Sequence, residues 1–330
     1  MDKQKLNLYL EILEKITENP IEPLAPQTAV FVANVVQYCV TQLKTDEDKK
    51  LFVPRLLALL KTVKPTSKQD LILQYFLGLN YNEQDGEIKE IIDFMKKYGF
   101  SIYPYEFMTK YNPTNVEVFG DYVLHQGKRL YFPSDHSPQQ IQVYYNALLA
   151  EQDENSPHRY EVDGFRVEEG DVICDIGTAE GIWALSNVEK ASKVYLFECE
   201  PKWISTLQKT FEPWKEKVVI INKYVSDVNE NACVTLDALF ADQNINLIKA
   251  DIEGAERAML SGAKELLKRS DGLKLLLCAY HRDGDEVYLK DFLEQAGFDT
   301  GYSKGYMLFI YDENLKEPFV RRGLIRAKKI

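Results

Sequence analysis

Val172-Ile-Cys-Asp-Ile-Gly-Thr-Ala-Glu-Gly181 is the stretch that decides the fold of this chain. Its apolar beginning predicts a buried parallel strand, and a helix is expected after it. The glycines Gly177 and Gly181 allow a tight turn in which the backbone approaches a ligand closely. A second apolar run, residues 194–197, ends in Glu198, the position from which an acidic side chain binds a ribose diol. Together these features predict a site for an adenosine-containing cofactor.

The residues of the turn indicate which cofactor binds. A dinucleotide site requires Gly-x-Gly-x-x-Gly, but here Asp175 stands in the first glycine position and Glu180 adds a second carboxylate. Carboxylates repel a diphosphate and suit the sulfonium and ammonium of S-adenosylmethionine. We expect Glu198 to accept both ribose hydroxyls, Asp175 to lie near the ammonium, and Asp227 to contact adenine. The full set assigned to the cofactor is Asp175, Gly177, Thr178, Ala179, Gly181, Glu198, Cys199, Ser226, Asp227 and Asp251.

Composition limits the class of protein. The chain has 330 residues, 45% of them hydrophobic, which predicts about two domains with full cores. Its 51 acidic and 40 basic residues give a net charge of −11, which disfavours a nucleic-acid partner. The basic segment 321–329 is expected to be a solvated end. Five cysteines without a Cys-x-x-Cys pair, no signal peptide and no membrane-length apolar run predict a cytoplasmic protein.

The sequence predicts three regions. Residues 1–110 form a helical N-terminal domain, with helices expected near 6–18, 30–40, 51–63, 71–79 and 88–98. Residues 111–168 form a connector or lid: a small β meander, a helix that starts at Ser137-Pro138, and a hairpin around Asp163-Gly164. Residues 169–330 form the cofactor-binding domain, an α/β sheet with helices on both faces.

The strands of that domain alternate with helices, so most of the sheet is expected to be parallel. The predicted strands are Val172–Asp175, Lys193–Glu198, Val218–Tyr224, Ile245–Ala250, Leu273–Tyr280 and a final hairpin of Thr300–Ser303 with Tyr306–Tyr311. Ligands bind at the carboxyl ends of such strands. That rule gathers one group of polar residues at a single edge: Asp175, Glu198, Ser226, Asp227, Asp251 and His281.

A second constellation follows the fourth of these strands, in Lys249-Ala-Asp-Ile-Glu-Gly-Ala-Glu256. Ionisable groups at the end of a buried strand are costly unless they have a role. Helix capping explains Glu256 as well as function does. It explains Lys249 poorly, because a cation near a helix start opposes the helix dipole.

At this point the chain resembles the FkbM family of S-adenosylmethionine-dependent methyltransferases, over residues 156–312. The matching motifs are Asp175–Gly181, Phe197-Glu198, Thr235-Leu236-Asp237, Lys249–Glu256, Gly262-Ala263 and Tyr280-His281. The resemblance implies a class I methyltransferase fold, Rossmann-like with a seven-stranded sheet, and methylation of hydroxyl groups on sugars and secondary metabolites. One departure is that Cys199-Glu200 separates Glu198 from Pro201, where the family commonly has proline directly after the glutamate.

The expected reaction is in-line methyl transfer to an alcohol oxygen of a small molecule or carbohydrate, such as a polysaccharide precursor. The candidate catalytic residues are Lys249, Asp251, Glu253 and His281. His281 is the preferred base because its ordinary pKa is suitable, and Asp251 either orients it or is itself the base. A magnesium ion held by Asp251 and Glu253 is the rival arrangement, which the spacing does not demand. The other histidines, at positions 125, 136 and 158, are expected to be ordinary surface or loop residues.

Alternatives from other classes stay open. An NAD-dependent dehydrogenase or sugar epimerase lacks its glycine motif here, and a non-enzymatic binding module would not need Glu198, Asp251 and His281 together. A nucleic-acid methyltransferase lacks the Asn-Pro-Pro-Tyr signature after the fourth strand. Aromatic residues between Tyr103 and Tyr145 either line a carbohydrate-stacking lid or simply pack the meander.

Overall fold

The computed structural model describes residues 86–98, 101, 102 and 104–329, apart from the side chain of Lys96, and the single residues 50, 72 and 75. Helix α5 (Gly86–Tyr98) confirms the predicted helix at 88–98; the helices predicted before residue 71 and most of 71–79 lie outside the described residues. The chain divides into two compact units, Met1–Ile92 and Asp93–Ile330. The domain boundaries at 110 and 168 stay predictions.

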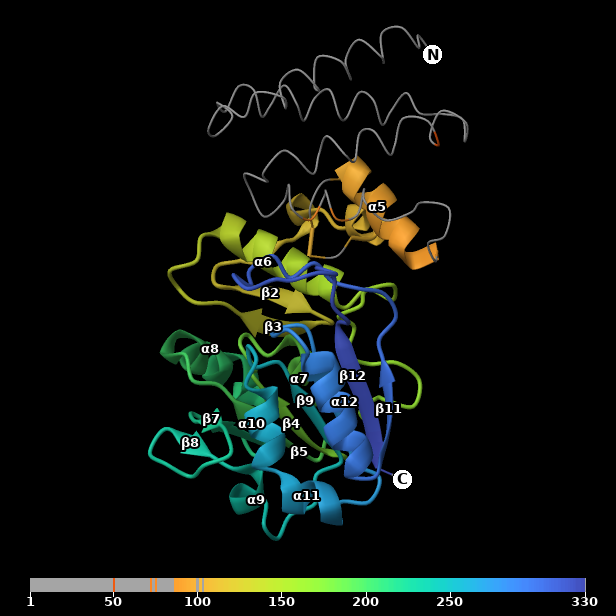
Figure 1. Cartoon of the computed structure of the whole chain (residues 1–330). Helices are drawn as coiled ribbons and strands as arrows, with labels where there is room; N and C mark the ends of the chain where they lie inside the picture. Colours follow the sequence, from red (N-terminus) through yellow and green to blue (C-terminus); the bar gives the residue numbers. More distant parts are fainter. Residues whose placement is uncertain are drawn as a thin grey trace, which may run out of the picture. The chain divides into compact units, whose positions relative to one another are not determined.

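A seven-stranded sheet forms the centre of the second unit (Figure 1), with the strand order β11-β12-β10-β9-β4-β5-β6. The neighbours from β10 to β6 pair in parallel, and β12 is antiparallel to both of its neighbours. This order and the one reversed strand define the class I methyltransferase sheet, as the sequence predicted. The strands are β4 (Val172–Ile176), β5 (Lys193–Phe197), β6 (Val218–Ile221), β9 (Leu247–Ala250), β10 (Lys274–Cys278), β11 (Phe298–Tyr302) and β12 (Leu324–Lys329).

The last strand corrects two predictions. The partner of β11 is β12, not Tyr306–Tyr311, and the basic segment expected to be solvated lies between β10 and β11. Ile325 and Ala327 are completely buried on one face of this strand. Arg326, on the other face, donates from Nε to the Tyr160 carbonyl at 2.9 Å. Buried basic side chains that bond to carbonyls concealed the strand in the sequence, because such residues resemble a polar tail.

Two layers of helices cover the sheet, because successive strand residues point to opposite faces. One layer packs on Ile173, Leu247 and Leu276, and the other on Cys174, Ile248 and Leu277. The first layer contains α7 (Ile182–Asn187) and α8 (Pro201–Phe211), and α6 (Pro138–Glu151) belongs to the same apolar cluster. The second contains α9 (Leu236–Leu239), α10 (Glu256–Ser261), α11 (Lys264–Arg269) and α12 (Asp285–Gln295).

The predicted β meander and its helix are present. The meander consists of β1 (Val118–Phe119), β2 (Tyr122–His125) and β3 (Lys128–Tyr131). Ser137 begins α6 with a capping box closed by Gln140, which satisfies two backbone N–H groups. The hairpin predicted after α6 is reduced to one bridge between Val162 and Phe165. Short 3₁₀ helices complete the region and its surroundings: η1 (Glu106–Lys110), η2 (Pro113–Asn115) and η3 (Glu212–Trp214).

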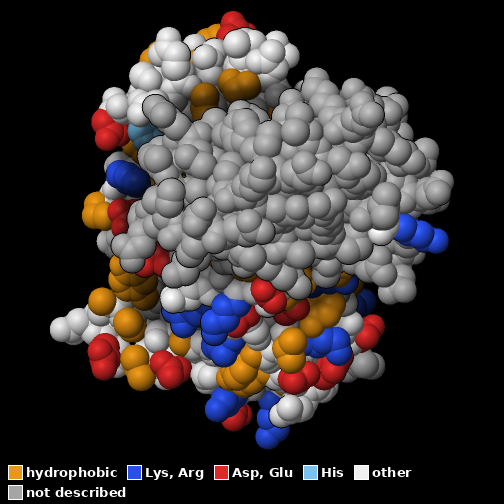
Figure 2. All heavy atoms as spheres, turned by 45° about the horizontal axis from the view of Figure 1, so that its top comes forward, with side chains coloured by type: hydrophobic (Ala, Val, Ile, Leu, Met, Phe, Trp, Pro, Cys, Tyr) orange, Lys and Arg blue, Asp and Glu red, His pale blue; other side chains and the backbone are white. Residues whose placement is uncertain are grey.

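The third predicted strand was too long. β6 ends at Ile221, and the chain then forms a separate parallel pair, β7 (Tyr224–Val225) with β8 (Cys233–Val234). On the described surface visible in Figure 2, acidic and basic side chains are interspersed. Among the residues that the structure describes, no helix has the length and apolar character needed to cross a membrane.

Candidate active site

The glycine loop after β4 is shaped by contacts inside the protein. Gly177 has a φ of +73°, and a Cβ there would lie 1.8 Å from the Asp251 carbonyl oxygen. Gly181 has a φ of +84°, and a Cβ there would lie 2.8 Å from Leu207 Cδ2 on α8. The first glycine therefore lets the loop lie against the end of β9, and the second lets it lie against α8. The close approach that the sequence predicted is made here by protein atoms.

The tip of the loop is tied to Glu198 at the end of β5. Glu198 Oε2 accepts a hydrogen bond from the Ala179 N–H at 2.7 Å, and Oε1 accepts from the Cys199 N–H at 2.7 Å. The Thr178 hydroxyl donates to the Asp175 carbonyl at 2.8 Å. Glu198 Oε1 also accepts from the Glu200 N–H at 2.8 Å. Three of the roughly four acceptor positions of a carboxylate are then used, and one remains for a ligand hydroxyl. The structure brings these predicted cofactor residues together.

Strand register places Asp175 beside Lys249. The two residues are paired across β4 and β9, so their side chains share one face, and Lys249 Nζ lies 2.9 Å from Asp175 Oδ1. Lys249 also donates to the Gly177 carbonyl at 2.9 Å. Burial raises the pKa of Asp175, although Lys249 opposes that rise. Burial alone would lower the pKa of Lys249, but Asp175 and Asp251 outweigh it and hold that pKa above its ordinary value.

Asp251 is the centre of a polar cluster at the end of β9. Its Oδ2 accepts from the Tyr160 hydroxyl at 2.8 Å and lies 3.4 Å from His158 Nε2. Its Oδ1 lies 3.2 Å from His281 Nε2 and accepts from the Tyr280 hydroxyl at 3.4 Å. Burial would raise the pKa of Asp251, but the two histidines hold it well below the ordinary value. Its side chain is still 22% exposed, so this ionised carboxylate can meet a ligand.

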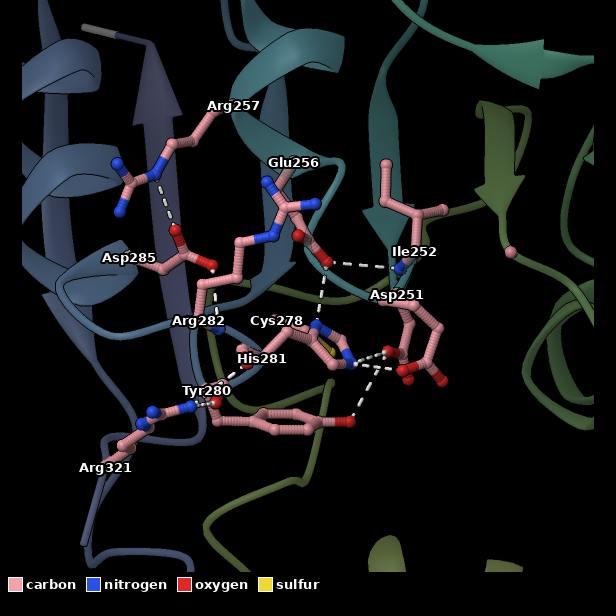
Figure 3. Close-up of polar contacts among 12 residues, drawn as sticks. Asp251, Ile252, Glu256, Arg257, Cys278, Tyr280, His281, Arg282, Asp285 and Arg321 are labelled. Carbon is pink, nitrogen blue, oxygen red and sulfur yellow. Dashed lines mark hydrogen bonds and ion pairs between the residues drawn. The ribbon is translucent and has the colours of Figure 1, made fainter. Parts of the chain in front are cut away.

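His281 is held on both ring nitrogens, as Figure 3 shows. Opposite Asp251, its Nδ1 lies 3.0 Å from Glu256 Oε1. That glutamate also accepts from the Ile252 N–H at 3.1 Å. Burial would lower the pKa of His281, but Asp251 and Glu256 raise it to about 10. His281 is therefore an imidazolium at neutral pH, with Nδ1 hydrogen-bonded to Glu256 and Nε2 in an ion pair with Asp251.

Glu253 lies at the solvent-exposed edge of the polar cluster. Its side chain is 85% exposed and its carboxylate lies 3.7 Å from His281 Nε2. Its φ is +54°, a conformation that is uncommon for a residue other than glycine and is found at functional sites. Gly254 follows with a φ of +92°, and a Cβ there would lie 2.5 Å from Arg282 Nε.

Glu180 is a buried carboxyl group. In the sequence it favoured a cationic ligand, but it was not among the residues assigned to the cofactor. Tyr144 of α6 donates a hydrogen bond to its Oε2 at 3.4 Å. Burial, reinforced by Glu151, raises the pKa of Glu180 to about 8. Burial, with help from Glu180, also raises the pKa of Tyr144. Glu180 is thus mostly protonated at neutral pH while the site holds no cation.

Ser226 and Asp227 are not brought to this cluster. The Ser226 carbonyl packs against Gly262, where a Cβ would lie 2.0 Å from it. Gly262 ends α10, whose first residue, Glu256, contacts His281. The two residues therefore pack at the other end of that helix. Their assignment to the cofactor, with Asp227 at the adenine, stays a prediction.

Sequence reasoning missed three cluster members: His158, Tyr160 and Tyr280. His158 was expected to be an ordinary surface or loop residue, but it is 2% exposed and lies beside Asp251. Nothing local in the sequence marks it or Tyr160, because both belong to an irregular segment before β4. Tyr280 had a usable signal, since it follows the same strand as His281.

Two sets of side chains in the described part of the chain have the spacing to hold a metal ion. One consists of His158, Asp251 and Cys278, the other of Asp251, Glu256 and His281, and within each set the ligand atoms lie within 4.8 Å of one another. Asp251 belongs to both. The mixed nitrogen, oxygen and sulfur donors of the first set do not suit magnesium, which prefers oxygen ligands.

A known family of methyltransferases matches part of this domain. The strand order of the domain is that of the class I methyltransferase fold, and residues 223–299 match the family model described as the methyltransferase FkbM domain. This match shows an FkbM-family methyltransferase domain and confirms the resemblance seen in the motifs, and that family implies S-adenosylmethionine as the cofactor. The matched residues include the Asp251 loop and His281, while the glycine loop and Glu198 precede them.

Two similar solved structures have low sequence identity to this chain. The methyltransferase FkbM of Methylobacillus flagellatus is 14% identical and aligns over 86% of this chain and 71% of its own, with a TM-score of 0.43. A putative methyltransferase of Streptococcus mutans in complex with S-adenosylhomocysteine is 14% identical over 51% of this chain and 93% of its own, with a TM-score of 0.36. Among curated protein sequences there is no match.

Proposed function

We propose that this FkbM-family enzyme transfers the methyl group of S-adenosylmethionine to a hydroxyl group of a sugar or glycan precursor. The observation that carries the proposal is Asp251, an ionised and partly exposed carboxylate held by two histidines and two tyrosines beside the glycine loop. Such a group can accept a hydrogen bond from an acceptor hydroxyl and hold its oxygen in line with the sulfonium.

The order of the strands supports a direction for the cofactor. Glu198 at the end of β5 is proposed to bind the ribose, with Cys199 in the same loop. The loop after β4, Gly177 to Gly181, is proposed to cradle the methionine end. Glu180 there supplies a carboxyl group that a bound cation would ionise, because a nearby positive charge lowers a carboxyl pKa. Asp175, already paired with Lys249, fixes the loop in this proposal.

Asp251 is the proposed proton acceptor. A sugar hydroxyl is a very weak acid in water, but its proton becomes strongly acidic as the oxygen forms its bond to the methyl carbon. A carboxylate of low pKa can take the proton at that stage, and such proton transfer contributes about 10²–10⁴-fold to the rate. Since the sulfonium is already an electrophile, alignment and proton removal are the main tasks of the protein.

His281 is then a positioning residue, because an imidazolium has no lone pair with which to accept a proton. Its Nδ1 is hydrogen-bonded to Glu256, which positions the ring so that its charge lies beside Asp251. Lys249 orients Asp175 and adds positive charge near Asp251. Glu253, at the solvent-exposed edge of the polar cluster, is placed to accept a hydrogen bond from another hydroxyl of the acceptor.

Magnesium held by Asp251 and Glu253 is the rival arrangement, although Glu253 belongs to neither of the two sets with metal-ligand spacing. The proposal does not need it, and the experiment tests it directly. We also propose that the acceptor is a small molecule or carbohydrate and not a nucleic acid. The net charge of −11 supports this choice, since phosphate contacts need clustered Lys and Arg. The expected cytoplasmic location stays a prediction.

The experiment measures S-adenosylhomocysteine formation with a panel of methyl glycosides, with magnesium and with a chelator in its place. Asp251→Asn is expected to lower kcat about 10²–10⁴-fold and to leave the dissociation constant of S-adenosylmethionine within about twofold. The control is Asp299→Asn, an exposed position on β11, which should leave both quantities unchanged. Full turnover by Asp251→Asn would remove Asp251 from the reaction, and loss of turnover in chelator alone would favour the magnesium arrangement.

A further inference from the structure

Residues 303–323, called the strap here, join β11 to β12 without regular secondary structure apart from one bridge, Met307 to Arg321. Irregular connections of this length in a compact domain are usually functional. Arg321 fastens the strap to the end of β10: its Nη1 donates to the Tyr280 carbonyl at 2.7 Å and to the His281 carbonyl at 3.0 Å. Figure 3 shows this arginine beside the backbone of both residues.

A row of aromatic rings leads along the strap from the polar cluster to solvent. The ring of Phe309 lies 5.5 Å from that of His281 and 5.0 Å from that of Tyr280. The ring of Tyr311 meets Phe309 edge-on at 5.7 Å and is 67% exposed. Tyr311 is the most exposed large hydrophobic side chain among the described residues, and it is joined through Phe309 to the rings of the polar cluster.

The order of the strands indicates that these aromatic rings lie on the side of the methyl acceptor and not on the side of the cofactor. The cofactor residues follow β4 and β5, so the methyl acceptor must approach from the other side, over β9 and β10. Asp251 follows β9 and His281 follows β10, and the strap is anchored to both the backbone and the ring of His281. Lys316 of the strap also pairs with Asp283 in the same loop, at 3.8 Å.

We propose that the exposed ring of Tyr311, supported edge-on by Phe309, is a stacking platform for the sugar ring of the acceptor. The C–H face of a pyranose is apolar and flat enough to lie on an aromatic ring, while its hydroxyls stay at the rim. Asp251 and the exposed Glu253 supply acceptors for those hydroxyls, and their negative charge selects an uncharged saccharide over an acidic one. This inference rests on the proposed function, because it names the subsite for the same acceptor.

The first test needs no turnover. Tyr311→Trp keeps an aromatic ring at an exposed position and makes it a fluorescent reporter. Methyl hexosides are expected to shift its emission saturably, while methyl glucuronoside has a weaker effect. Tyr224→Trp is the matched control, because Tyr224 is 59% exposed on β7, in a separate two-stranded sheet. The emission of Tyr224→Trp should not respond to the methyl hexosides. The native tryptophans contribute the same background fluorescence in both variants.

The second test separates this inference from the proposed function. Tyr311→Ala is expected to raise the KM of the best methyl glycoside about tenfold and to leave the affinity for S-adenosylmethionine unchanged, with Tyr311→Phe restoring the KM. Turnover of a glycoside with an unchanged KM and no emission shift would overturn the platform and leave methyl transfer standing. A saturable emission shift without turnover of any glycoside would support the platform and overturn the proposed methyl transfer.

Discussion

At the scale of single residues, Asp175 and Glu180 are two carboxyl groups of one loop in different electrostatic surroundings. Both are buried, and burial raises both pKa values. Asp175 has a cation at 2.9 Å, whereas the direct partner of Glu180 is the Tyr144 hydroxyl. Without a cation in contact, Glu180 is the group whose ionisation must respond most to pH and to a positively charged ligand.

Glu180 should make the ligand-free protein less stable as pH rises. Its pKa is about 8 in the folded protein and 4.5 in an ordinary environment. Between these two pH values the folded state binds more protons than the unfolded state. The contribution of Glu180 to the free energy of unfolding is therefore complete below pH 4.5 and is lost as the pH rises through 8. Thermal unfolding should show the melting temperature of the wild type falling over this window more than that of Glu180→Gln.

The pH dependence of the affinity for S-adenosylmethionine is a second test of the role of Glu180. A bound cation favours the ionised form, so the affinity of the wild type relative to Glu180→Gln should increase with pH over this window. The comparison with the variant cancels any titration of the ligand itself. Parallel pH profiles for the two proteins would show that Glu180 does not contact the cation.

Glu198→Gln tests the ribose site. The variant loses charge-assisted hydrogen bonds worth about 1.5–3 kcal/mol, which corresponds to a roughly 10–100-fold weaker affinity for S-adenosylmethionine by calorimetry. Glu200→Gln is the control, because Glu200 is exposed two residues further on. Equal affinities for the two variants would place the ribose elsewhere.

At the scale of elements, the glycine loop depends on its contact with β9. Gly177→Ala would put a Cβ against the Asp251 carbonyl, while Gly272, with a φ of +71° against +73° for Gly177, has open space around it. Both substitutions strain the backbone, which costs about 1–2 kcal/mol. We expect Gly177→Ala to lower the free energy of unfolding in urea by about 1–3 kcal/mol more.

Gly272→Ala serves as the reference for strain without a clash. Should the two variants have equal stability, the loop would be free to move away from β9. The reported contact between Gly177 and Asp251 would then contribute nothing to the fold, and the glycine would be required only for its positive φ.

The sequence predicted the elements that carry clear periodicity and turn chemistry. Strands β4, β5, β9 and β10 coincide with apolar runs of the sequence, and Ser137 before a proline predicted the start of α6. Asp175, Glu198, Asp251 and His281 were found because the carboxyl ends of parallel strands share an edge. Two features escaped this reasoning. β12 contains buried basic residues such as Arg326, and His158 reaches Asp251 from a segment without any pattern, so only the folded chain reveals both.

At the scale of the whole molecule, the last strand, β12, is inserted between β10 and β11 and joins them into one sheet. Ile325 is completely buried there, and Ile325→Ala should lower the free energy of unfolding by about 2–5 kcal/mol in urea titration. Val287→Ala, at a position that is 54% exposed on α12, should change it by no more than about 0.5 kcal/mol. A loss of under 1 kcal/mol for Ile325→Ala would mean that β12 adds little to the sheet.

The place of β12 also has a consequence for the order in which the protein assembles during its synthesis. β10 and β11 are translated first, yet they pair with each other only through β12. Until residues 324–329 have emerged from the ribosome, each of the two earlier strands has an open edge where β12 will bind. Open edges of this kind attract foreign strands, so a pause in translation just before residue 324 should expose the nascent chain to aggregation more than a pause at any earlier linker of this sheet.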